Sequence, residues 1–418
     1  MRAQIISIGD ELLIGQTVNT NASFIGSRLA EIGVEVNKIV TTSDNLHAIH
    51  EDLRNALKAV NLVIVTGGLG PTHDDITRDA ICSFYNCELR EDEDVLNDIR
   101  ERFRRFGREL TPTNLDQAKV PACCEPIRNP NGTAPGFWIK HEGQIVAVMP
   151  GVPREMKAMM ENFVIPNIRL NFGTELKNVH RINLLTTGIA ESNLFDKLNP
   201  IDDVLPDVKV AFLPNLSGVK IRITGEGATP EEARTKADAA TQQIKLRVGR
   251  YVYGEGDVDQ AEIIAKILKE RQLTVATAES CTGGHIADML TDIPGSSEYF
   301  ERGVVSYSNA SKVEILQVDE DLIQDKGAVS SEVAEQMAKG VRSISGSDLG
   351  LSITGILGPK GATPNKPVGL VFIGVASFDK AVVKQFNFGG NRYENKIRAA
   401  HAALEILRRF ILGISIET

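Results

Sequence analysis

The segment LTVATAESCTGGHIADML, at residues 273 to 290, combines residue types that support nucleophilic catalysis. Its pattern predicts a strand, a sharp turn and a helix whose first turn holds Thr282, Gly283 and Gly284. A serine in such a turn, here Ser280, projects its hydroxyl at the mouth of a sheet. Free backbone N–H groups at the helix start then stabilise an oxyanion or a phosphate. The segment therefore predicts a nucleophilic serine beside an anion site.

A serine hydroxyl needs a base, and none of the seven histidines lies in a recognisable hydrolase triad motif. In GVVSYSNASK, Tyr307 and Lys312 lie five residues apart, in a strand-like VVSYS followed by NASKVEIL. A buried lysine loses its charge because desolvation disfavours the ammonium form. We therefore expect Lys312 to accept the Ser280 proton, with Tyr307 oriented to relay or donate it.

Structural interpretations of the same residues remain open at this point. A serine before a helix is ordinarily an N-cap, and the tyrosine and lysine could be a strand aromatic and a solvated lysine. Cys281 would itself be a nucleophile if the helix dipole stabilised its thiolate, although such a cysteine is more often small buried packing. Arg392 and Arg398 could clamp a nucleotide phosphate bidentately or form surface salt bridges.

Three motifs rich in glycine and acidic residues occur in the first part of the chain: SIGDELLIG at 7 to 15, TGGLGPTHDDIT at 66 to 77 and MPGVPREM at 149 to 156. In the second motif, Gly67, Gly68 and Gly70 let backbone N–H groups approach an anion closely. Thr72, placed at the start of the next helix, adds a hydroxyl and the positive end of the helix dipole. The motif predicts a phosphate cradle.

Carboxylates beside a bound phosphate are the usual ligands of Mg²⁺ or a similar divalent ion. The candidate ligands are Asp10, Asp44, Asp74, Asp75 and Glu155, and the pair that directly follows the cradle is favoured. The alternative is that the glycine-rich turn is only a tight connection and the aspartate pair only a charge pair at a helix N-terminus.

The elements that must position these residues alternate between strands and helices. Short apolar runs such as NLVIVTGGLG, between segments of helical spacing, indicate buried parallel strands in a sheet covered on both faces. Ligands of such sheets bind beyond the C-terminal ends of the strands, where the motifs lie. From about residue 172, three strand-like segments and the helix TPEEARTKADAATQQIKLRV, with Thr229 as its N-cap, indicate a smaller α+β unit. The linker YGEGDVDQ closes that unit.

With 418 residues the chain is expected to form two or three domains. The predicted division is 1–171, 172–254 and 255–418. A net charge of −9 argues against nucleic acid as a partner, and the run Arg100–Arg105 is interpreted as a solvated helix face. With no membrane-spanning apolar stretch, no signal-peptide pattern and five cysteines without metal-site spacing, we expect a soluble cytoplasmic protein with reduced thiols.

In order and spacing, the three N-terminal motifs resemble the molybdopterin-binding fold that forms the N-terminal domain of the CinA (competence/damage-inducible protein A) family. The family's GGTG is here Gly67-Gly68-Leu69-Gly70. The resemblance implies a three-layer α/β/α domain. It also implies hydrolysis of ADP-ribose to AMP and ribose 5-phosphate with a divalent metal, Mg, Mn or Co.

The C-terminal segments resemble the nicotinamide-nucleotide amidase domain of the same family, in which the corresponding Ser, Tyr and Lys are catalytic. The match includes SITGILGPKGATPNKPVGLVFIG, with Thr354 and Gly355 as substrate-binding positions, and GGNRYENKIR. It implies an α/β amidase domain that converts nicotinamide mononucleotide to nicotinate mononucleotide and ammonia, without a cofactor. Where the family has GIAGPxGG, this chain has Leu357 and Ala362, which bear on substrate fit.

The connector is expected to be KH-like and, lacking a G-x-x-G loop, to act as a spacer and dimer element instead of a nucleic-acid reader. The resemblance implies a homodimer active in pyridine nucleotide recycling. Two other hypotheses are a non-catalytic accessory protein of competence or DNA damage with degenerate sites, and genuine molybdopterin handling by the N-terminal domain.

Overall fold

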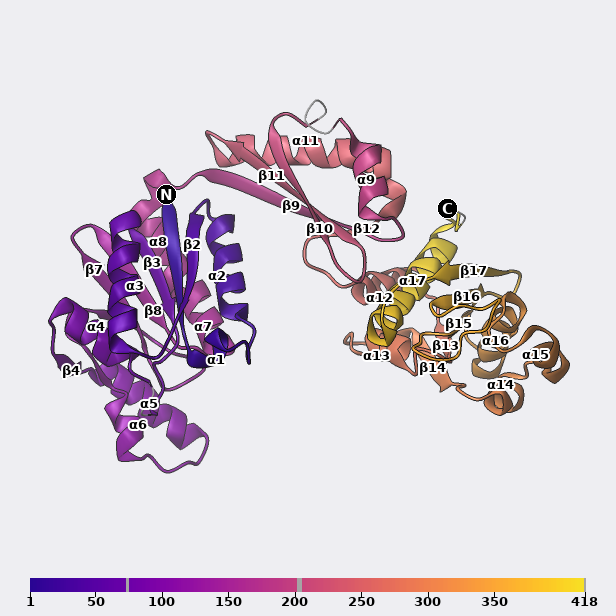
Figure 1. The fold of residues 1–418 in the computed structure, drawn as a ribbon, viewed down its shortest axis with the longest axis horizontal. Helices are drawn as coiled ribbons and strands as arrows, with labels where there is room; N and C mark the ends of the chain where they lie inside the picture. Colours follow the sequence, from indigo (N-terminus) through magenta and orange to yellow (C-terminus); the bar gives the residue numbers. More distant parts are fainter. Residues whose placement is uncertain (73–74, 201–204, 417–418) are drawn as a thin grey trace. The chain divides into compact units, whose positions relative to one another are not determined.

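The computed structural model describes residues 1–72, 75–200 and 205–416 (Figure 1). The predicted metal ligand Asp74 lies outside this part of the chain. The protein divides into two compact units, one formed by residues 1–180 with 226–233 and the other by residues 181–225 with 234–418. The second unit contains most of the connector together with the whole C-terminal domain.

A six-stranded sheet in the order β2-β1-β3-β8-β7-β6 forms the centre of the N-terminal domain. The strands are β1 (Arg2–Ile8), β2 (Glu35–Thr42), β3 (Leu62–Thr66), β6 (Glu125–Ile127), β7 (Gly136–His141) and β8 (Gln144–Met149). The first four strands of this order are parallel to one another, as predicted. In contrast, β7 is antiparallel to both of its neighbours, β8 and β6. The reason is the tight turn Glu142–Gly143 between β7 and β8, in which both residues have positive φ.

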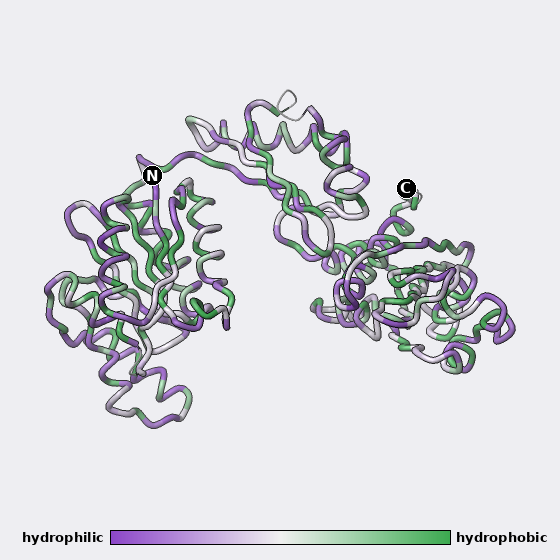
Figure 2. Tube along the Cα trace, viewed as in Figure 1, coloured by the Kyte–Doolittle hydropathy of each residue, from purple (hydrophilic) through white to green (hydrophobic). Residues whose placement is uncertain are grey.

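Helices cover both faces of this sheet. Alternate residues of β1 point to opposite faces, so Ile5 packs with α2 (Thr20–Glu31), α7 (Pro153–Met159) and α8 (Ile165–Phe172). Ile6 packs with α3 (Leu46–Ala59) and α4 (Thr77–Tyr85) on the other face. Figure 2 shows the apolar strands running between these helices. The predicted three-layer α/β/α arrangement is confirmed.

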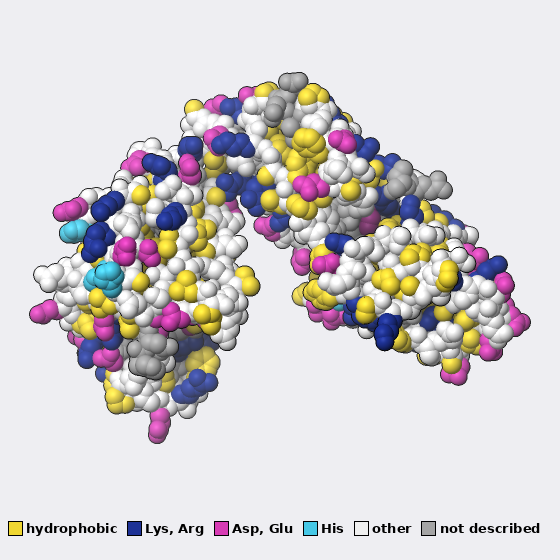
Figure 3. Space-filling view, in the orientation of Figure 1, with side chains coloured by type: hydrophobic (Ala, Val, Ile, Leu, Met, Phe, Trp, Pro, Cys, Tyr) yellow, Lys and Arg dark blue, Asp and Glu magenta, His cyan; other side chains and the backbone are white. Residues whose placement is uncertain are grey.

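Shorter elements lie around this core. They are α1 (Asp10–Leu13), β4 (Leu89–Glu91), α5 (Glu93–Arg105), α6 (Pro112–Asp116), β5 (Lys119–Pro121), the π-helical turn η1 (Met160–Val164) and the 3-10 turn η2 (Gly173–Glu175). The basic run Arg100–Arg105 belongs to α5, where Arg104 pairs with Glu101. On the face of this domain seen in Figure 3, basic and acidic side chains are interspersed.

The connector is a four-stranded sheet in the order β10-β11-β9-β12 with helices on one face. Its elements are β9 (Asn178–Thr186), α9 (Glu191–Leu198), β10 (Val208–Pro214), β11 (Val219–Gly227), α11 (Pro230–Val248), the 3-10 turn η3 (Gly249–Tyr251) and β12 (Val252–Glu255). Its apolar core includes the buried residues Leu184, Ile221 and Ile244. Thr229 caps α11 as predicted, because its hydroxyl accepts a hydrogen bond from Glu232 N at 3.2 Å.

The C-terminal domain is a second three-layer structure, built on a sheet in the order β14-β13-β15-β16-β17. Its elements are α12 (Gln260–Arg271), β13 (Val275–Glu279), α13 (His285–Thr291), the 3-10 turn η4 (Ser296–Glu298), β14 (Phe300–Val305), α14 (Asn309–Leu316), α15 (Glu320–Lys326), α16 (Ser331–Ser345), β15 (Leu349–Gly355), β16 (Leu370–Ala376), β17 (Ala381–Asn387) and α17 (Arg392–Leu412). The strands β14, β13 and β15 are parallel, and β16 and β17 complete the sheet as an antiparallel meander.

The inner strand β13, which lies between β14 and β15, packs on both faces of the sheet. Val275 contacts the core under α12, α13 and α17, whereas Ala276 and Ala278 face the core under α14, α15 and α16. The turn that begins with Ser280 follows directly at the carboxyl end of β13. In the described part of the chain, no helix combines the length and apolar character that a membrane crossing needs.

Candidate active sites

Ser280 and Lys312 meet at the carboxyl end of the C-terminal sheet. Ser280 directly follows β13, and Lys312 lies in α14, which follows the neighbouring strand β14. The Nζ atom of Lys312 lies 3.1 Å from Oγ of Ser280 and 2.7 Å from the carbonyl oxygen of Ser306. Because its hydroxyl is engaged by this amine, and the N-cap of α13 is Gly284, Ser280 is not an ordinary capping serine.

Lys312 is buried, with 1% of its surface exposed. Within the described residues it has no carboxylate partner. Burial lowers the pKa of Lys312, and the neighbouring Cys281 opposes this shift only in part. A solvated lysine is thus excluded, and an uncharged amine can accept a proton from the serine hydroxyl.

Glu279, the last residue of β13, was not predicted to belong to the site. Its side chain is buried, and its two carboxylate oxygens accept hydrogen bonds from the N–H groups of Gly284 at 3.1 Å, Ile286 at 3.0 Å and Ala287 at 2.8 Å. The prediction of free N–H groups at the helix start is therefore wrong for these three. An acidic residue at the end of an apolar strand, just before a glycine-rich turn, was the signal available in the sequence.

The turn between Ser280 and α13 is longer than predicted. The helix begins at His285, so Thr282, Gly283 and Gly284 precede it and do not form its first turn. Gly284 has a φ of 96°, a left-handed conformation that glycine adopts without strain. Thr282 is buried, and its hydroxyl has no hydrogen-bond partner among the described residues. An orphaned buried hydroxyl next to a nucleophile is a polar group that a ligand or water would satisfy.

Cys281 does not fit the role of an alternative nucleophile. Its side chain packs in the apolar core beneath α12 and α17, and burial raises the pKa of its thiol to about 12. The reactive form of cysteine is the thiolate, which is scarce at neutral pH when the pKa is so high. The structure favours the interpretation of Cys281 as small buried packing.

Tyr307 and Arg392 form a second pair near this site. The sequence pattern predicted Tyr307 within a strand, but it lies just after the end of β14. Its surface is 62% exposed. Nη2 of Arg392 donates to the Tyr307 hydroxyl at 3.1 Å, and Nη1 donates to the carbonyl of Gly358 at 2.8 Å. In the described chain, no hydrogen bond joins Tyr307 to Ser280 or Lys312.

Arg398 lies elsewhere. It is six residues from Arg392 on α17, so the two side chains leave the helix in directions about 120° apart. Arg398 lines a separate cavity between α17, β17 and the connector. The predicted joint clamp of both arginines on one phosphate is therefore not formed in this structure.

The two predicted substrate-binding positions at the end of β15, Thr354 and Gly355, are held by protein contacts. The hydroxyl of Thr354 donates to the carbonyl of Ala328 at 2.8 Å. Gly355 packs against Leu370 and Val371 of the adjacent strand so closely that a side chain would collide. Both residues shape the edge of the sheet, and neither presents a free side-chain donor to a ligand.

Leu357, one of the departures from the family sequence, points into the core and is 2% exposed. Its carbonyl accepts a hydrogen bond from Nδ2 of the buried Asn395 at 3.1 Å, and the same nitrogen donates to the carbonyl of Gly390 at 2.8 Å. The side chain of Leu357, larger than the alanine of the family sequence, is therefore accommodated within the apolar core. Ala362, the second departure, is exposed. Asn395 joins the two loops near Arg392, a role that its sequence position did not reveal.

The N-terminal glycine motif borders a cavity of about 350 Å³ at the carboxyl ends of β1, β3 and β8. Gly67, Gly68 and Gly70 line it together with the carboxylate-bearing residues Asp44 and Asp75, and with Glu155 from the start of α7. Gly67 has a φ of 115°, and a side chain there would collide with the carbonyl oxygen of Ile8. The motif and three predicted carboxylates therefore share one cavity.

The threonine at the helix start is Thr77 instead of Thr72. The helix α4 begins at Thr77, whose hydroxyl donates to the carbonyl of Gly67 at 2.9 Å. Thr72 lies in the preceding bend, where its N–H donates to Asp75 Oδ2 at 2.9 Å and its hydroxyl bonds to the same oxygen. The prediction that Thr72 presents a helix dipole to a phosphate is wrong because the chain makes an additional bend first.

The described carboxylates of the N-terminal domain do not form a complete set of metal ligands. In the ranges that the structure describes, no three His, Cys, Asp or Glu side chains gather as a metal site. Asp10 does not line the cavity; its Oδ1 accepts from Asp44 N at 3.4 Å, while its own N–H donates to Asp44 Oδ2 at 3.0 Å. Magnesium commonly takes one or two carboxylates plus substrate phosphates and water. The carboxylates around the cavity fit that partial kind of site.

These features define a three-part α/β protein with a molybdopterin-binding-like first domain, a KH-like connector and a final domain that carries a serine–lysine pair. Family models match each part: "Probable molybdopterin binding domain" at residues 4–170, "Damage-inducible protein CinA KH domain" at 181–254 and "CinA C-terminal domain" at 257–411. The predicted resemblance is confirmed, and the chain belongs to the CinA family.

Full-length relatives support this membership. CinA-like proteins of Chloroherpeton thalassium and of Salinibacter ruber are each 42% identical, over 98% of this chain and 99% of the relative. A crystal structure of the protein CinA from Thermoplasma acidophilum is 42% identical and covers 40% of this chain and 96% of its own, with a TM-score of 0.37.

Proposed function

We propose that the C-terminal domain hydrolyses the carboxamide of nicotinamide mononucleotide to nicotinate mononucleotide and ammonia. The observation that carries this proposal is the buried amine of Lys312, 3.1 Å from the Ser280 hydroxyl and without a carboxylate partner in the described chain. A serine activated by an uncharged lysine is suited to acyl transfer from an amide. The family resemblance supplies the substrate.

In this mechanism Ser280 Oγ attacks the carboxamide carbon while its proton passes to Lys312 Nζ. The tetrahedral intermediate collapses, the ammonium group returns a proton to the leaving nitrogen, and ammonia departs. Water then attacks the resulting ester while Lys312 takes one of its protons. The ammonium returns this proton to the departing Ser280 oxygen, and nicotinate mononucleotide is released. Glu279 accepts hydrogen bonds from N–H groups at Gly284 and beyond, and not from those of Cys281 and Thr282. We therefore assign the N–H groups of Cys281 and Thr282 to the oxyanion.

Arg392 is assigned to the nucleotide phosphate. Two of its five N–H donors are used by Gly358 and Tyr307, which leaves donors for a phosphate oxygen. Tyr307 then orients the guanidinium, in place of the proton relay expected from its sequence position. Arg398 takes no part in this mechanism, because it lines a different cavity.

The test is ammonia release from nicotinamide mononucleotide by the full chain and by Ser280→Ala, with exposed Ser297→Ala as the matched control. We expect activity in the wild type and the control and its loss in Ser280→Ala. Absence of ammonia from the correctly folded wild type would contradict the amidase and favour the accessory role in competence or DNA damage. An equal rate in Ser280→Ala would remove this serine from the mechanism.

For the N-terminal domain we propose hydrolysis of ADP-ribose to AMP and ribose 5-phosphate with a divalent cation. When bound, the cation neutralises charge on the pyrophosphate and lowers the pKa of a bound water. Asp44, Asp75 and Glu155 are the described residues that would hold it, because their side chains surround the glycine-lined cavity. The glycine backbone is assigned to the phosphates.

AMP release from ADP-ribose with Mg²⁺, Mn²⁺ or Co²⁺ tests this second activity. We expect Asp75→Asn to lower it strongly, whereas Asp94→Asn, an exposed position on α5 of the same domain, leaves it unchanged. Equal activity in both variants would exclude Asp75 from the site. Co-purification of molybdopterin in place of this activity would support the pterin-handling hypothesis.

A further inference from the structure

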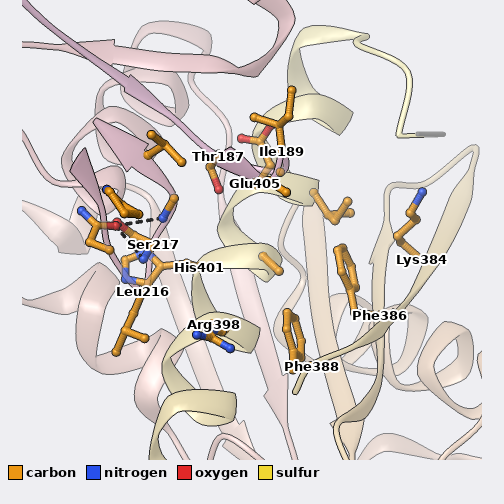
Figure 4. A pocket seen from close by; sticks show the side chains of 18 of the residues that line it. Thr187, Ile189, Leu216, Ser217, Lys384, Phe386, Phe388, Arg398, His401 and Glu405 are labelled. Atoms are coloured by element: carbon orange, nitrogen blue, oxygen red, sulfur yellow. Dashed lines mark hydrogen bonds between the residues drawn. The ribbon is translucent and has the colours of Figure 1, made fainter. Parts of the chain in front are cut away.

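A cavity of about 590 Å³ lies between the connector and the C-terminal domain, and all of its lining residues belong to the same compact unit (Figure 4). The connector contributes the segment after β9, at residues 187–191, and the turn between β10 and β11, at residues 214–219. The C-terminal domain contributes β17 and α17. The volume is within the range of small-molecule sites, roughly 300 to 1,000 Å³.

One wall of the cavity is aromatic. Phe386 and Phe388 lie on the same side of the chain at the end of β17, with ring centroids 5.6 Å apart and an angle of 4° between the ring planes. Ile189 and Leu216 approach from the connector, and Ile406 from α17 (Figure 4). These side chains form an apolar surface that suits a planar ring.

The polar part of the cavity carries an unbalanced positive charge. Arg398 and Phe388 both line it (Figure 4), and Arg398 has no carboxylate partner among the described residues. The buried Glu405 does not supply one, because its oxygens bond to Arg408 Nε at 2.8 Å and Arg409 Nε at 2.6 Å. Two arginines on one glutamate leave a net charge of +1 in this buried cluster.

A second observation points the same way. Nη2 of Arg409, which lines the cavity and is 2% exposed, has no hydrogen-bond partner among the described residues. Of the other titratable groups that line the cavity, Lys384 and His401 are hydrogen-bonded, and Glu191 is exposed. Lys384 donates to the carbonyl of Ile416 at 3.0 Å, and His401 contacts Gln260 at 2.9 Å, with burial as the main cause of its lowered pKa.

We propose that this cavity binds a small aromatic anion, with its ring against Phe386 and Phe388 and its negative group on Arg398. Apolar walls with one unmatched guanidinium are complementary to that chemistry, because a charge-assisted hydrogen bond compensates the desolvated cation. Neither Ser280 nor Lys312 lines the cavity, so this site is separate from the proposed amidase site. Its ligand would contact the connector and the C-terminal domain at once.

The probe is 8-anilinonaphthalene-1-sulfonate, an aromatic monoanion whose fluorescence rises in apolar sites, titrated into the full-length protein. We expect saturable binding, weakened about tenfold in Arg398→Gln because one charge-assisted hydrogen bond is lost. Lys396→Gln is the matched control, since it removes a positive charge from the same helix without lining the cavity. Phe388→Ala is expected to weaken binding as well.

A neutral probe separates charge from apolar contact. N-phenyl-1-naphthylamine lacks the sulfonate, so its affinity is expected to be the same in the wild type and in Arg398→Gln, and to fall in Phe388→Ala. Circular dichroism confirms that each variant is folded. Equal weakening of the anionic probe in Arg398→Gln and Lys396→Gln, or no saturable binding to the wild type, would overturn the proposal whatever the outcome of the amidase assay.

Discussion

The two candidate active sites lie at the same kind of place in the fold, beyond the carboxyl ends of parallel strands, but they are built differently. At the C-terminal site, protein contacts alone bring a serine and a lysine to 3.1 Å, and a buried glutamate anchors the turn that follows the serine. At the N-terminal site, the described carboxylates surround an open cavity and no three gather as a metal site.

The difference follows from the chemistry proposed for each site. A lysine base must be held without its charge, which requires burial and exclusion of acidic partners in advance of binding. A site for a pyrophosphate and a cation is completed by the ligand, because phosphate oxygens and water supply most of the coordination. The first kind of site is visible in the protein by itself, and the second shows only its protein half.

The largest effect is expected at the buried amine. Lys312→Met keeps an unbranched chain but removes the base, so we expect ammonia release to fall by about 10³-fold or more. Lys312→Arg is expected to lose activity too, because guanidinium does not deprotonate in proteins. Steady-state rates with nicotinamide mononucleotide provide the measurement, with thermal unfolding as a check on folding. Retention of most of the rate in Lys312→Met would break the proposed contrast between the sites.

Chelation distinguishes the two sites directly. In EDTA, AMP release from ADP-ribose is expected to fall by about two orders of magnitude, since a bridging cation stabilises several kcal/mol of transition-state charge. Ammonia release from nicotinamide mononucleotide in the same solution is expected to stay unchanged. Adding Mg²⁺, Mn²⁺ or Co²⁺ back should restore the first activity only. Parallel loss of both activities would show that the two sites do not differ in this way.

The pH dependence of the amidase follows from the lowered pKa of Lys312. The base is active when neutral, so the rate is expected to rise about tenfold per pH unit below the folded-state pKa and to level off above it. Because burial lowers this pKa, the plateau begins at a lower pH than for a solvated lysine. The measurement is kcat/KM against pH. A rate still rising at the pKa of free lysine would refute the neutral-amine assignment.

Glu279 provides the smallest expected effect. Replacing it by glutamine removes the charge that accepts three N–H groups, and we expect the free energy of unfolding of the C-terminal domain to fall by about 2 kcal/mol. Glu262→Gln, at an exposed position on α12, is the control and is expected to change little. Denaturant unfolding followed by circular dichroism provides the measurement. Equal stability of the two variants would show that Glu279 does not anchor the turn.

Sequence patterns predicted the elements of both domains because periodicity and capping are local. The segments around Ile5 and Val275 form buried strands as predicted, and Thr229 caps its helix as expected. The proximity of Ser280 and Lys312 was also predictable, since each follows one of two adjacent strands of the same sheet. The antiparallel outer strands were missed because a parallel core does not determine the direction of its edges.

What the sequence determined by itself is the choice of residue types at strand ends: a serine, a lysine and glycines next to acids. The tertiary structure decided which of them lack competing partners. Glu279 takes the amides that a ligand was expected to use, and Thr77 takes the place predicted for Thr72. Arg398 faces a cavity shared with the connector, away from Arg392. Burial and charge pairing depend on segments far apart in the chain, so local patterns do not contain them.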